Sequence, residues 1–155
     1  MSDALPHSGP SATARFCLFL DGFAESVGEF TECYGLQVDV EIEEVQEGGQ
    51  NQFVHRLPGR MKWPNIVFKR GLVDPVLFNW LQKVSGDGFA GNGNKIERAT
   101  GRIVLYANDF DGKPIREWSF VDGYPVKWRG PKLVVSENAV VTEELEIAHH
   151  GFTAR

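Results

Sequence analysis

Four histidines and two cysteines are the residues of this sequence best suited to bind a metal or act as nucleophiles. His149 and His150 are adjacent at the end of an expected strand, so their side chains should point to opposite faces and cannot chelate one ion together. Cys17 and Cys33 lie in apolar, strand-like segments, where we expect buried thiols and no disulfide. The spacing of these residues therefore predicts no metal and no cofactor.

Motifs of the common enzyme classes are also missing from the sequence. It contains no GxSxG, no HExxH and no cysteine beside a histidine. The glycine-rich segment 86–94 follows an expected helix and precedes a strand, the reverse of the order that binds phosphate, so we expect a flexible connection there. Asp109 to Gly112 resembles the start of a calcium loop, but position twelve would be Phe120, and we expect a hairpin turn.

These observations predict that the protein is not an enzyme. One alternative stays open, because 21 acidic residues could form a catalytic carboxylate pair on folding and the sequence cannot rank such pairs. The other alternative is that these acids form a solvated surface.

Length and charge limit the organisation and the partners. The 155 residues, with a net charge of −5, suit one domain with a packed core, and we expect a flexible N-terminal arm over 1–14 and a single domain over 15–155. The absence of a long basic stripe argues against binding nucleic acid by phosphate neutralisation. No apolar run reaches the length needed to span a bilayer, and no secretory signal is present, so we expect cytoplasmic synthesis without membrane anchoring.

Hydrophobic patterning predicts a mainly β fold. Apolar and polar residues alternate most clearly after Gln37, which predicts a half-buried strand, with either a bulge or the end of the strand near Glu43 and Glu44, before Val45. We expect further strands at 15–20, 30–36, 65–71, 102–108, 115–123, 124–128, 132–136 and 140–150. The polar stretch 48–64 is interrupted by two prolines, and we expect a long excursion outside the core.

Only one helix is expected. Asp74 provides an N-cap and Pro75 suits the first helical position. Apolar residues then recur with helical spacing up to about Gly86, at Leu77, Trp80, Leu81 and Val84. The sequence thus predicts an antiparallel β-barrel or sandwich with one flanking helix.

Charges are segregated along the chain. Asp39 to Glu47 holds five acids and no base, whereas Arg56 to Arg70 holds five bases and no acid, and Glu137 to Glu146 holds four acids. These runs could pair across neighbouring strands within one molecule. Alternatively, an acidic strand and a basic excursion on opposite edges of one subunit could join different copies into rings or filaments. The sequence leaves both alternatives open.

Several segments resemble the tail tube proteins of contractile phage tails and phage-tail-like injection particles. The resemblance runs in order from about Arg15 to Phe152 and is carried by FTECYGL, EVQEGG, RLPGRMKWPNIVFKRG and REWSFVDGYPVKWRGPKLVVSENAVVTEELEIAHHGF. The most specific parts are LPGxxKxxNIxFKRG and WxF…PVKWxGP…ExLEIxHxG.

This resemblance implies a structural subunit without an active site. Six β-barrel subunits would close into a ring by joining their sheets, and the rings would stack into a tube inside a sheath, with an excursion over roughly 45–63 reaching an adjacent subunit or ring. Implied partners are other copies, the sheath, baseplate or spike proteins, a tube terminator, and a cargo of DNA or effector protein that slides through the lumen without specific binding. The particle would be a virion tail or an injection device.

Together, the charge runs and the resemblance suggest which residues contact other copies. The candidates are Val38, Val40, Glu41, Ile42, Glu44, Val45, Glu47, Gly48, Gly49, Arg56, Arg60, Lys62, Trp63, Lys69 and Arg70. Two other functions stay open: a baseplate-proximal tube initiator or adaptor of the same family, and an independent ligand-binding barrel, which would need a roomy apolar pocket.

Overall fold

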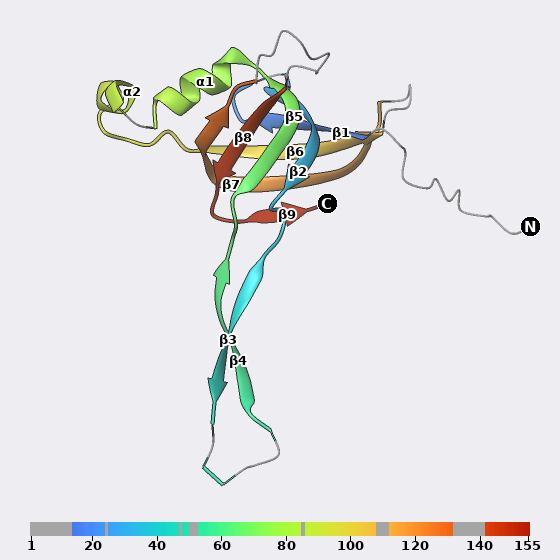
Figure 1. Cartoon of the computed structure of the whole chain (residues 1–155), viewed down its shortest axis with the longest axis vertical. Helices are drawn as coiled ribbons and strands as arrows, with labels where there is room; N and C mark the ends of the chain where they lie inside the picture. Colours follow the sequence, from blue (N-terminus) through green and yellow to red (C-terminus); the bar gives the residue numbers. More distant parts are fainter. Residues whose placement is uncertain are drawn as a thin grey trace, which may run out of the picture.

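Six antiparallel strands close into a barrel in the computed structural model, which describes residues 14–23, 25–46, 48–49, 53–84, 86–107, 112–131 and 142–155. The strand order is β6-β1-β2-β5-β8-β7, and pairing between β6 and β7 closes the sheet (Figure 1). Their bounds are β1 Ala14–Leu20, β2 Gly28–Tyr34, β5 Ile66–Val73, β6 Ala99–Ala107, β7 Pro114–Arg129 and β8 Glu143–Ala148. A short strand, β9 (Phe152–Ala154), pairs with β7 beyond the end of β8. The predicted antiparallel β-barrel is therefore confirmed.

Apolar side chains fill the interior of the barrel. Leu18, Phe68 and Ile103 are fully inaccessible to solvent, and the rings of Phe30 and Phe68 lie 4.8 Å apart. Burying a large apolar side chain contributes about 1.5–3 kcal/mol relative to leaving it exposed. The interior is thus a packed core and not a ligand cavity.

The predicted helix is present as α1 (Pro75–Gln82) at one end of the barrel. The carboxylate of Asp74 accepts a hydrogen bond of 2.9 Å from the backbone N–H of Val76, as an N-cap should. Leu77 and Trp80 are buried, and the indole N–H of Trp80 donates to the carbonyl of Glu97 at 2.7 Å. The cap and the helical spacing therefore identified this element correctly.

A second helix, α2 (Gly86–Gly91), lies where we expected a flexible connection. Gly88 packs against the end of α1, where a Cβ atom would collide with the backbone of Gln82. The glycine therefore allows close approach between two helices, and the prediction of an unstructured loop over the whole of 86–94 is wrong.

The strands predicted at 115–123 and 124–128 are one long strand, β7. Asp122 adopts a left-handed φ of 53°, and Gly123 follows at the point where the strand leaves β9 and begins to pair with β8. A local irregularity of this kind bends a strand without ending it. Antiparallel pairing of β6 with β7 agrees with the predicted hairpin, whose turn residues 109–111 lie outside the described residues, as does the strand predicted at 132–136.

Two further strands, β3 (Asp39–Val45) and β4 (His55–Lys62), form a separate two-stranded sheet. The excursion does lie outside the core, but the strand β4 within it was not predicted. Pro58 is tolerated because both strands of a two-stranded ribbon are edge strands. Of the two alternatives predicted near Glu43 and Glu44, the end of the strand agrees with the structure, because β3 ends at Val45 and the register shifts instead between Val40 and Ile42. We call β3 and β4 together the hairpin.

Candidate assembly interface

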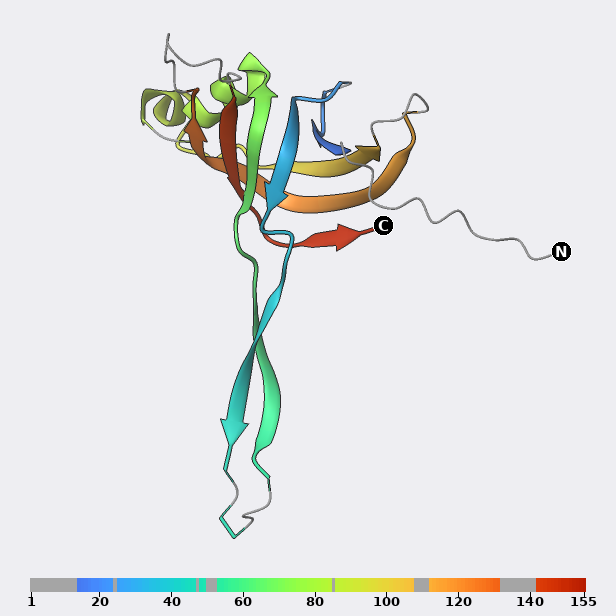
Figure 2. The same cartoon turned by 45° about the vertical axis from the view of Figure 1, so that its right-hand side comes forward.

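The hairpin projects away from the barrel, on the side opposite to α1 (Figure 1; Figure 2). Both of its strands pair only with each other among the described elements. Every residue of β3 and β4 is exposed except Gly59, which is half-buried. The hairpin therefore has no core of its own, and an isolated two-stranded hairpin is marginally stable in water.

One face of the hairpin near the barrel is apolar. Val40 lies directly opposite Met61 in the ladder, and the side chains of Val38 and Ile42 share that face because strand residues alternate. Ile42 is 59% exposed and Met61 is 63% exposed. A set of large apolar side chains exposed on one face is typical of a surface that binds another molecule.

Ion pairs connect the two strands of the hairpin. Lys62 pairs with Glu41, and the Nε atom of Arg56 lies 3.3 Å from a carboxylate oxygen of Glu44. The hydrogen bond to Glu41 raises the pKa of Lys62 above its usual value. The acidic and basic runs therefore face each other within one molecule, which supports the first alternative of the sequence analysis. The idea that they occupy opposite edges of the subunit is wrong, because the hairpin register places them side by side.

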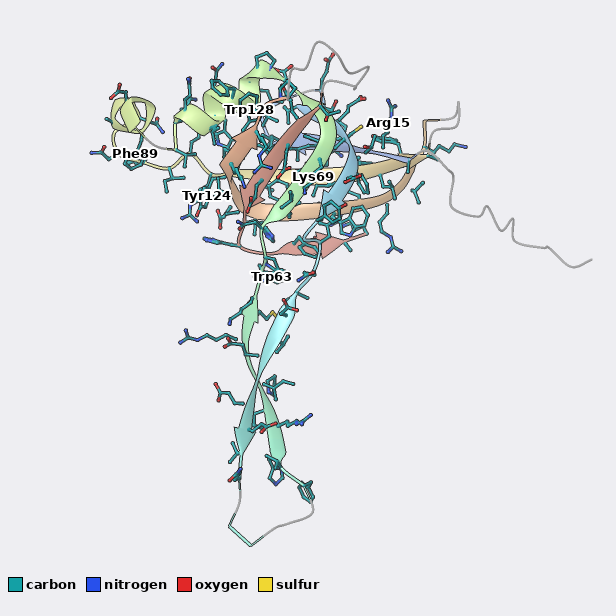
Figure 3. All side chains as sticks on the ribbon, in the orientation of Figure 1. Arg15, Trp63, Lys69, Phe89, Tyr124 and Trp128 are labelled. Atoms are coloured by element: carbon teal, nitrogen blue, oxygen red, sulfur yellow. The ribbon has the colours of Figure 1, made fainter. Side chains whose placement is uncertain are left out.

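An aromatic cluster joins the hairpin to the barrel. The ring of Trp63 lies at this junction (Figure 3), 5.2 Å from that of Phe152. The backbone N–H of Gly151 donates to Nδ1 of His149 at 3.0 Å, so the imidazole proton resides on Nε2, which donates to the carbonyl of Pro64 at 2.9 Å. His149 thus connects the end of the hairpin to the segment between β8 and β9.

Gly35, which directly follows β2, allows the chain that enters the hairpin to pass close to the start of β5. Gly35 has a φ of 85°, in the left-handed region, and a Cβ atom there would collide with the carbonyl of Asn65. Asn65 in turn donates a 2.7 Å hydrogen bond to Glu146 on β8. The hairpin therefore leaves the barrel through a tightly packed junction.

The predicted interface residues fall into three groups. Most of them lie on the hairpin: Val40, Glu41, Ile42, Glu44, Val45, Arg56, Arg60 and Lys62, with Val38 directly before β3 and Gly48 and Gly49 in the described part of its turn. Trp63 lies at the junction. Lys69 lies instead on β5 in the barrel wall (Figure 3), 3.8 Å from Glu144 and above the ring of Tyr34. Arg70 is in β5, and its side chain, like the whole of Glu47, lies outside the described residues.

Sequence reasoning missed the junction residues His149, Gly151 and Phe152. The only available signal was the run of aromatic and histidine residues near the end of the chain. His149 is buried whereas His150 is exposed beside Asp122, which agrees with the predicted opposite faces.

Within the described ranges, no group of three or more histidine, cysteine or acidic residues could hold a metal ion. Both cysteines are free thiols, and burial raises the pKa of Cys33 to about 12. No helix in the described part of the chain is long and apolar enough to cross a membrane.

One pocket of about 550 Å³ lies outside the barrel, between α1 and the neighbouring ends of β1 and β6. An ion pair of 2.8 Å between Lys83 and Glu97 lies at its wall. The pocket therefore differs from the apolar interior cavity that an independent ligand-binding barrel would require.

Comparison with known proteins identifies the family. The family model of the T4-like virus tail tube protein gp19 matches residues 13–153. The chain belongs to this tail tube family. No curated protein gives a significant match to the sequence.

Solved structures with the same fold come from contractile injection systems. A chain in the structure of the anti-feeding prophage cap, the tube-terminating cap, is 20% identical in sequence to this chain. The two superpose with a TM-score of 0.73, covering 99% of this chain and 95% of that one. A chain in the sheath-tube complex of an extracellular contractile injection system, PVC, in the extended state is 17% identical in sequence. Its TM-score is 0.69, covering 91% of this chain and 88% of that one. A chain in the baseplate of the anti-feeding prophage is 16% identical in sequence. Its TM-score is 0.63, covering 100% of this chain and 97% of that one. The resemblance found in the sequence is thus confirmed, and the chain is a tail tube protein.

Proposed function

We propose that this tail tube protein is a structural subunit of an injection particle or virion tail, and that six copies form a ring and the rings stack into a hollow tube. The observation that carries this proposal is the hairpin, whose apolar face is exposed in the single chain. Another copy of the chain supplies the missing cover. The neighbours in solved tubes, caps and baseplates support the same assembly.

Ring closure uses the strand edges that the barrel leaves open. Because β6 pairs with β7, these two strands leave no free edge through which the barrel sheets of neighbouring copies could join. In the described part of the chain, β9 pairs only with β7, and the outer edges of the hairpin pair with no other strand. These edges, together with the candidate residues of the hairpin, form the interfaces between copies.

The other partners of the tube are proteins of the same particle. The outside of the tube contacts a sheath, and its ends contact a baseplate or spike and a terminator. A ring of six copies carries a formal charge of about −30, six times the −5 of one chain. A lumen wall that shares this negative charge would repel DNA or an acidic effector and let the cargo slide. The protein has no catalytic role, and its copies are made in the cytoplasm.

A baseplate-proximal initiator or adaptor is the second candidate, favoured by the similarity to the anti-feeding prophage baseplate. Copy number separates the two functions. A main tube protein occurs in many rings of one particle, whereas an initiator occurs in one. Quantitative mass spectrometry of intact particles would therefore decide between them.

Electron microscopy of the purified protein, with and without a tube initiator, tests assembly. We expect rings or tubes of uniform bore from the wild type. The variant Ile42→Asp/Met61→Asp should give none while its far-UV circular dichroism stays that of the wild type, because it places charges on the apolar face without touching the core. Substitution to Ser of Asp87 on α2 and of Lys95 before β6, both exposed and outside the hairpin, serves as a control. A wild type that stays monomeric at high concentration with an initiator would overturn the proposal.

A further inference from the structure

Among the described residues, His149 is the one buried polar or charged side chain, with 7% of its surface exposed. Three aromatic rings surround its imidazole: those of Trp63, Phe120 and Phe152, with ring centroids 6.1, 6.4 and 6.0 Å away. Trp63 belongs to the segment that leads from the hairpin back into the barrel, where Figure 3 labels it. His149 therefore lies between a segment attached to the hairpin and the wall of the barrel.

The hydrogen bonds of His149 permit only one protonation state. A backbone N–H can only donate, so the 3.0 Å bond from Gly151 requires an unprotonated Nδ1. A backbone carbonyl can only accept, so the 2.9 Å bond to Pro64 requires a proton on Nε2. The neutral imidazole satisfies both partners at once. We call His149, Gly151 and Pro64 together the latch, because they join the returning end of the hairpin to the segment before β9.

A second proton on the imidazole opposes this arrangement. It has to bind Nδ1, where it faces the N–H of Gly151, and two donors cannot share a hydrogen bond. Gly151 is buried, so its N–H then loses its acceptor away from water, and the charged imidazole loses its hydration as well. The rings of Trp63 and Phe152 attract a cation, but they do not replace the acceptor that Gly151 loses. The closed latch therefore requires a neutral His149.

Charged groups on the elements around the latch have other partners. They are Lys62 of β4, Asp122 of β7, Glu146 of β8 and Arg155 after β9. The first three pair with or accept from Glu41, His150 and Asn65, respectively. In the described part of the chain, no ion pair or hydrogen bond joins any of the four to the imidazole of His149. A charge on His149 would therefore have no counter-ion in contact with it.

His150, the next residue, provides a comparison within the same chain. It is exposed, with Nε2 at 3.0 Å from Nη1 of Arg98 and Nδ1 at 3.4 Å from a carboxylate oxygen of Asp122. Water can solvate this imidazole in either protonation state, and the carboxylate of Asp122 accepts from its charged form. Protonation of His150 should therefore leave the junction between hairpin and barrel intact.

We propose that the latch is proton-sensitive: the neutral imidazole of His149 fixes the hairpin on the barrel, and its protonation releases the hairpin while the barrel stays folded. Histidine is the side chain that gains a proton between about pH 8 and pH 5. Because the closed latch holds the neutral form, its stabilisation is complete above this range and is lost as the pH falls through it. This inference concerns the single chain and does not depend on the proposed tube.

Gly151 belongs to the same device. Its φ of 128° lies in the region that favours glycine, and a Cβ atom there would lie 3.3 Å from the indole of Trp63. The absence of a side chain lets the backbone of Gly151 contact the Trp63 ring while its N–H reaches His149. Opening of the latch should therefore also loosen the packing of Trp63 against Phe152, whose rings lie 5.2 Å apart.

NMR spectroscopy of the unassembled chain, titrated downward from pH 7.5, tests the latch. At the start we expect imidazole nitrogen shifts that identify an unprotonated Nδ1 and a protonated Nε2 at His149. As His149 gains its second proton, the Gly151 amide should lose about tenfold in protection from hydrogen exchange, corrected for the intrinsic rate. Nuclear Overhauser contacts between Trp63 and Phe152 should weaken in step, while amides of β1 and β6 keep their protection.

Two results of this titration would overturn the proposal. One is a His149 that becomes protonated while the Gly151 amide stays protected. The other is a His149 that stays neutral until β1 and β6 lose their protection too, because the hairpin would then not be released from a folded barrel.

Substitution of two adjacent histidines separates the latch from a general effect of acid. His149→Asn keeps an oxygen that can accept from Gly151 but gains no proton near neutral pH, and His150→Asn is the matched control. Between pH 7.5 and pH 5.5, the thermal midpoints of the wild type and of His150→Asn should fall by about 3 °C more than that of His149→Asn. Equal shifts in all three proteins would contradict the latch. Neither experiment requires tubes, so its failure would leave the proposed function standing, and a failure of assembly would leave the latch standing.

Discussion

The barrel and the hairpin use apolar residues in opposite ways. Phe68 and Ile147 of the barrel are completely buried, whereas Ile42 and Met61 of the hairpin are more than half exposed. The barrel therefore obtains its stabilisation within one chain, whereas we propose that the hairpin obtains it from contacts with other copies. Stability of the subunit and assembly of the tube should accordingly depend on different residues.

Truncation in the barrel core gives the largest expected effect on the subunit. Phe68→Ala should lower the free energy of unfolding by about 3–5 kcal/mol, because it leaves a cavity among Phe30 and its neighbours. Met61→Ala on the hairpin should change it by less than about 0.5 kcal/mol. Urea denaturation of the two monomeric variants measures both. Equal losses would remove the distinction between the two regions.

Substitution at the junction between the hairpin and the barrel should have the second largest effect on the stability of the subunit. Gly35→Ala forces a left-handed backbone on a residue with a side chain, at about 1–2 kcal/mol, and adds a collision with Asn65. Gly48→Ala, in the turn of the hairpin with open space around it, is the matched control and should have little effect. The midpoints of thermal unfolding compare them. A harmless Gly35→Ala would show that the junction is not tightly packed.

The rates at which cysteines of the barrel and of the hairpin are alkylated compare the two regions, and this test disturbs the structure less than the substitutions above. Burial raises the pKa of Cys33 to about 12, so this thiol should react slowly with iodoacetamide at pH 8. A cysteine introduced at exposed Met61 should react at the rate of a free thiol. Mass spectrometry after timed quenching measures both rates, and fast modification of Cys33 in the folded protein would contradict its burial.

The raised pKa of Cys33 should also make the free energy of unfolding depend on pH in the alkaline range. The folded state holds the Cys33 proton more tightly than the unfolded state, so its contribution is complete below about pH 9 and is lost as the pH rises toward 12. Cys33→Ala should therefore lose less stability than the wild type between pH 8 and pH 10. Denaturation at the two pH values measures the difference, and parallel losses would count against it.

Ion pairs of the hairpin should matter least to the subunit. Lys62→Gln removes the pair with Glu41, but both groups are exposed and water replaces the interaction. We expect no measurable change in the thermal midpoint of the monomer. A clear loss of stability would mean that this pair fastens the hairpin in the isolated chain.

Local signals in the sequence were sufficient for most of the barrel and for α1. Asp74 and Pro75 form a start signal that depends on adjacent residues, and the period of two in β3 depends only on its own side chains. Pro58 in β4 and Gly88 in α2 carry the opposite local signals, and their structures depend on contacts with other segments. These two elements could not be predicted from local patterns.

The candidate interface was predictable only in part for the same reason. Alternation predicts that Val40 and Ile42 share one face of a strand, but it does not show whether another copy or the chain itself covers that face. The junction depends on a contact between His149 and Pro64, which are 85 positions apart. Charge segregation was real, yet only the register showed that Glu41 and Lys62 pair within one hairpin.

Hydrogen exchange of the hairpin amides, measured in the monomer and in assembled tubes, tests the central claim most directly. We predict that amides of β3 and β4 exchange much faster than those of β1 and β6 in the monomer, and that they become protected in the tubes. Protection of the hairpin already in the monomer, or continued rapid exchange in the tubes, would contradict the account, because the hairpin would then not gain its cover from another copy.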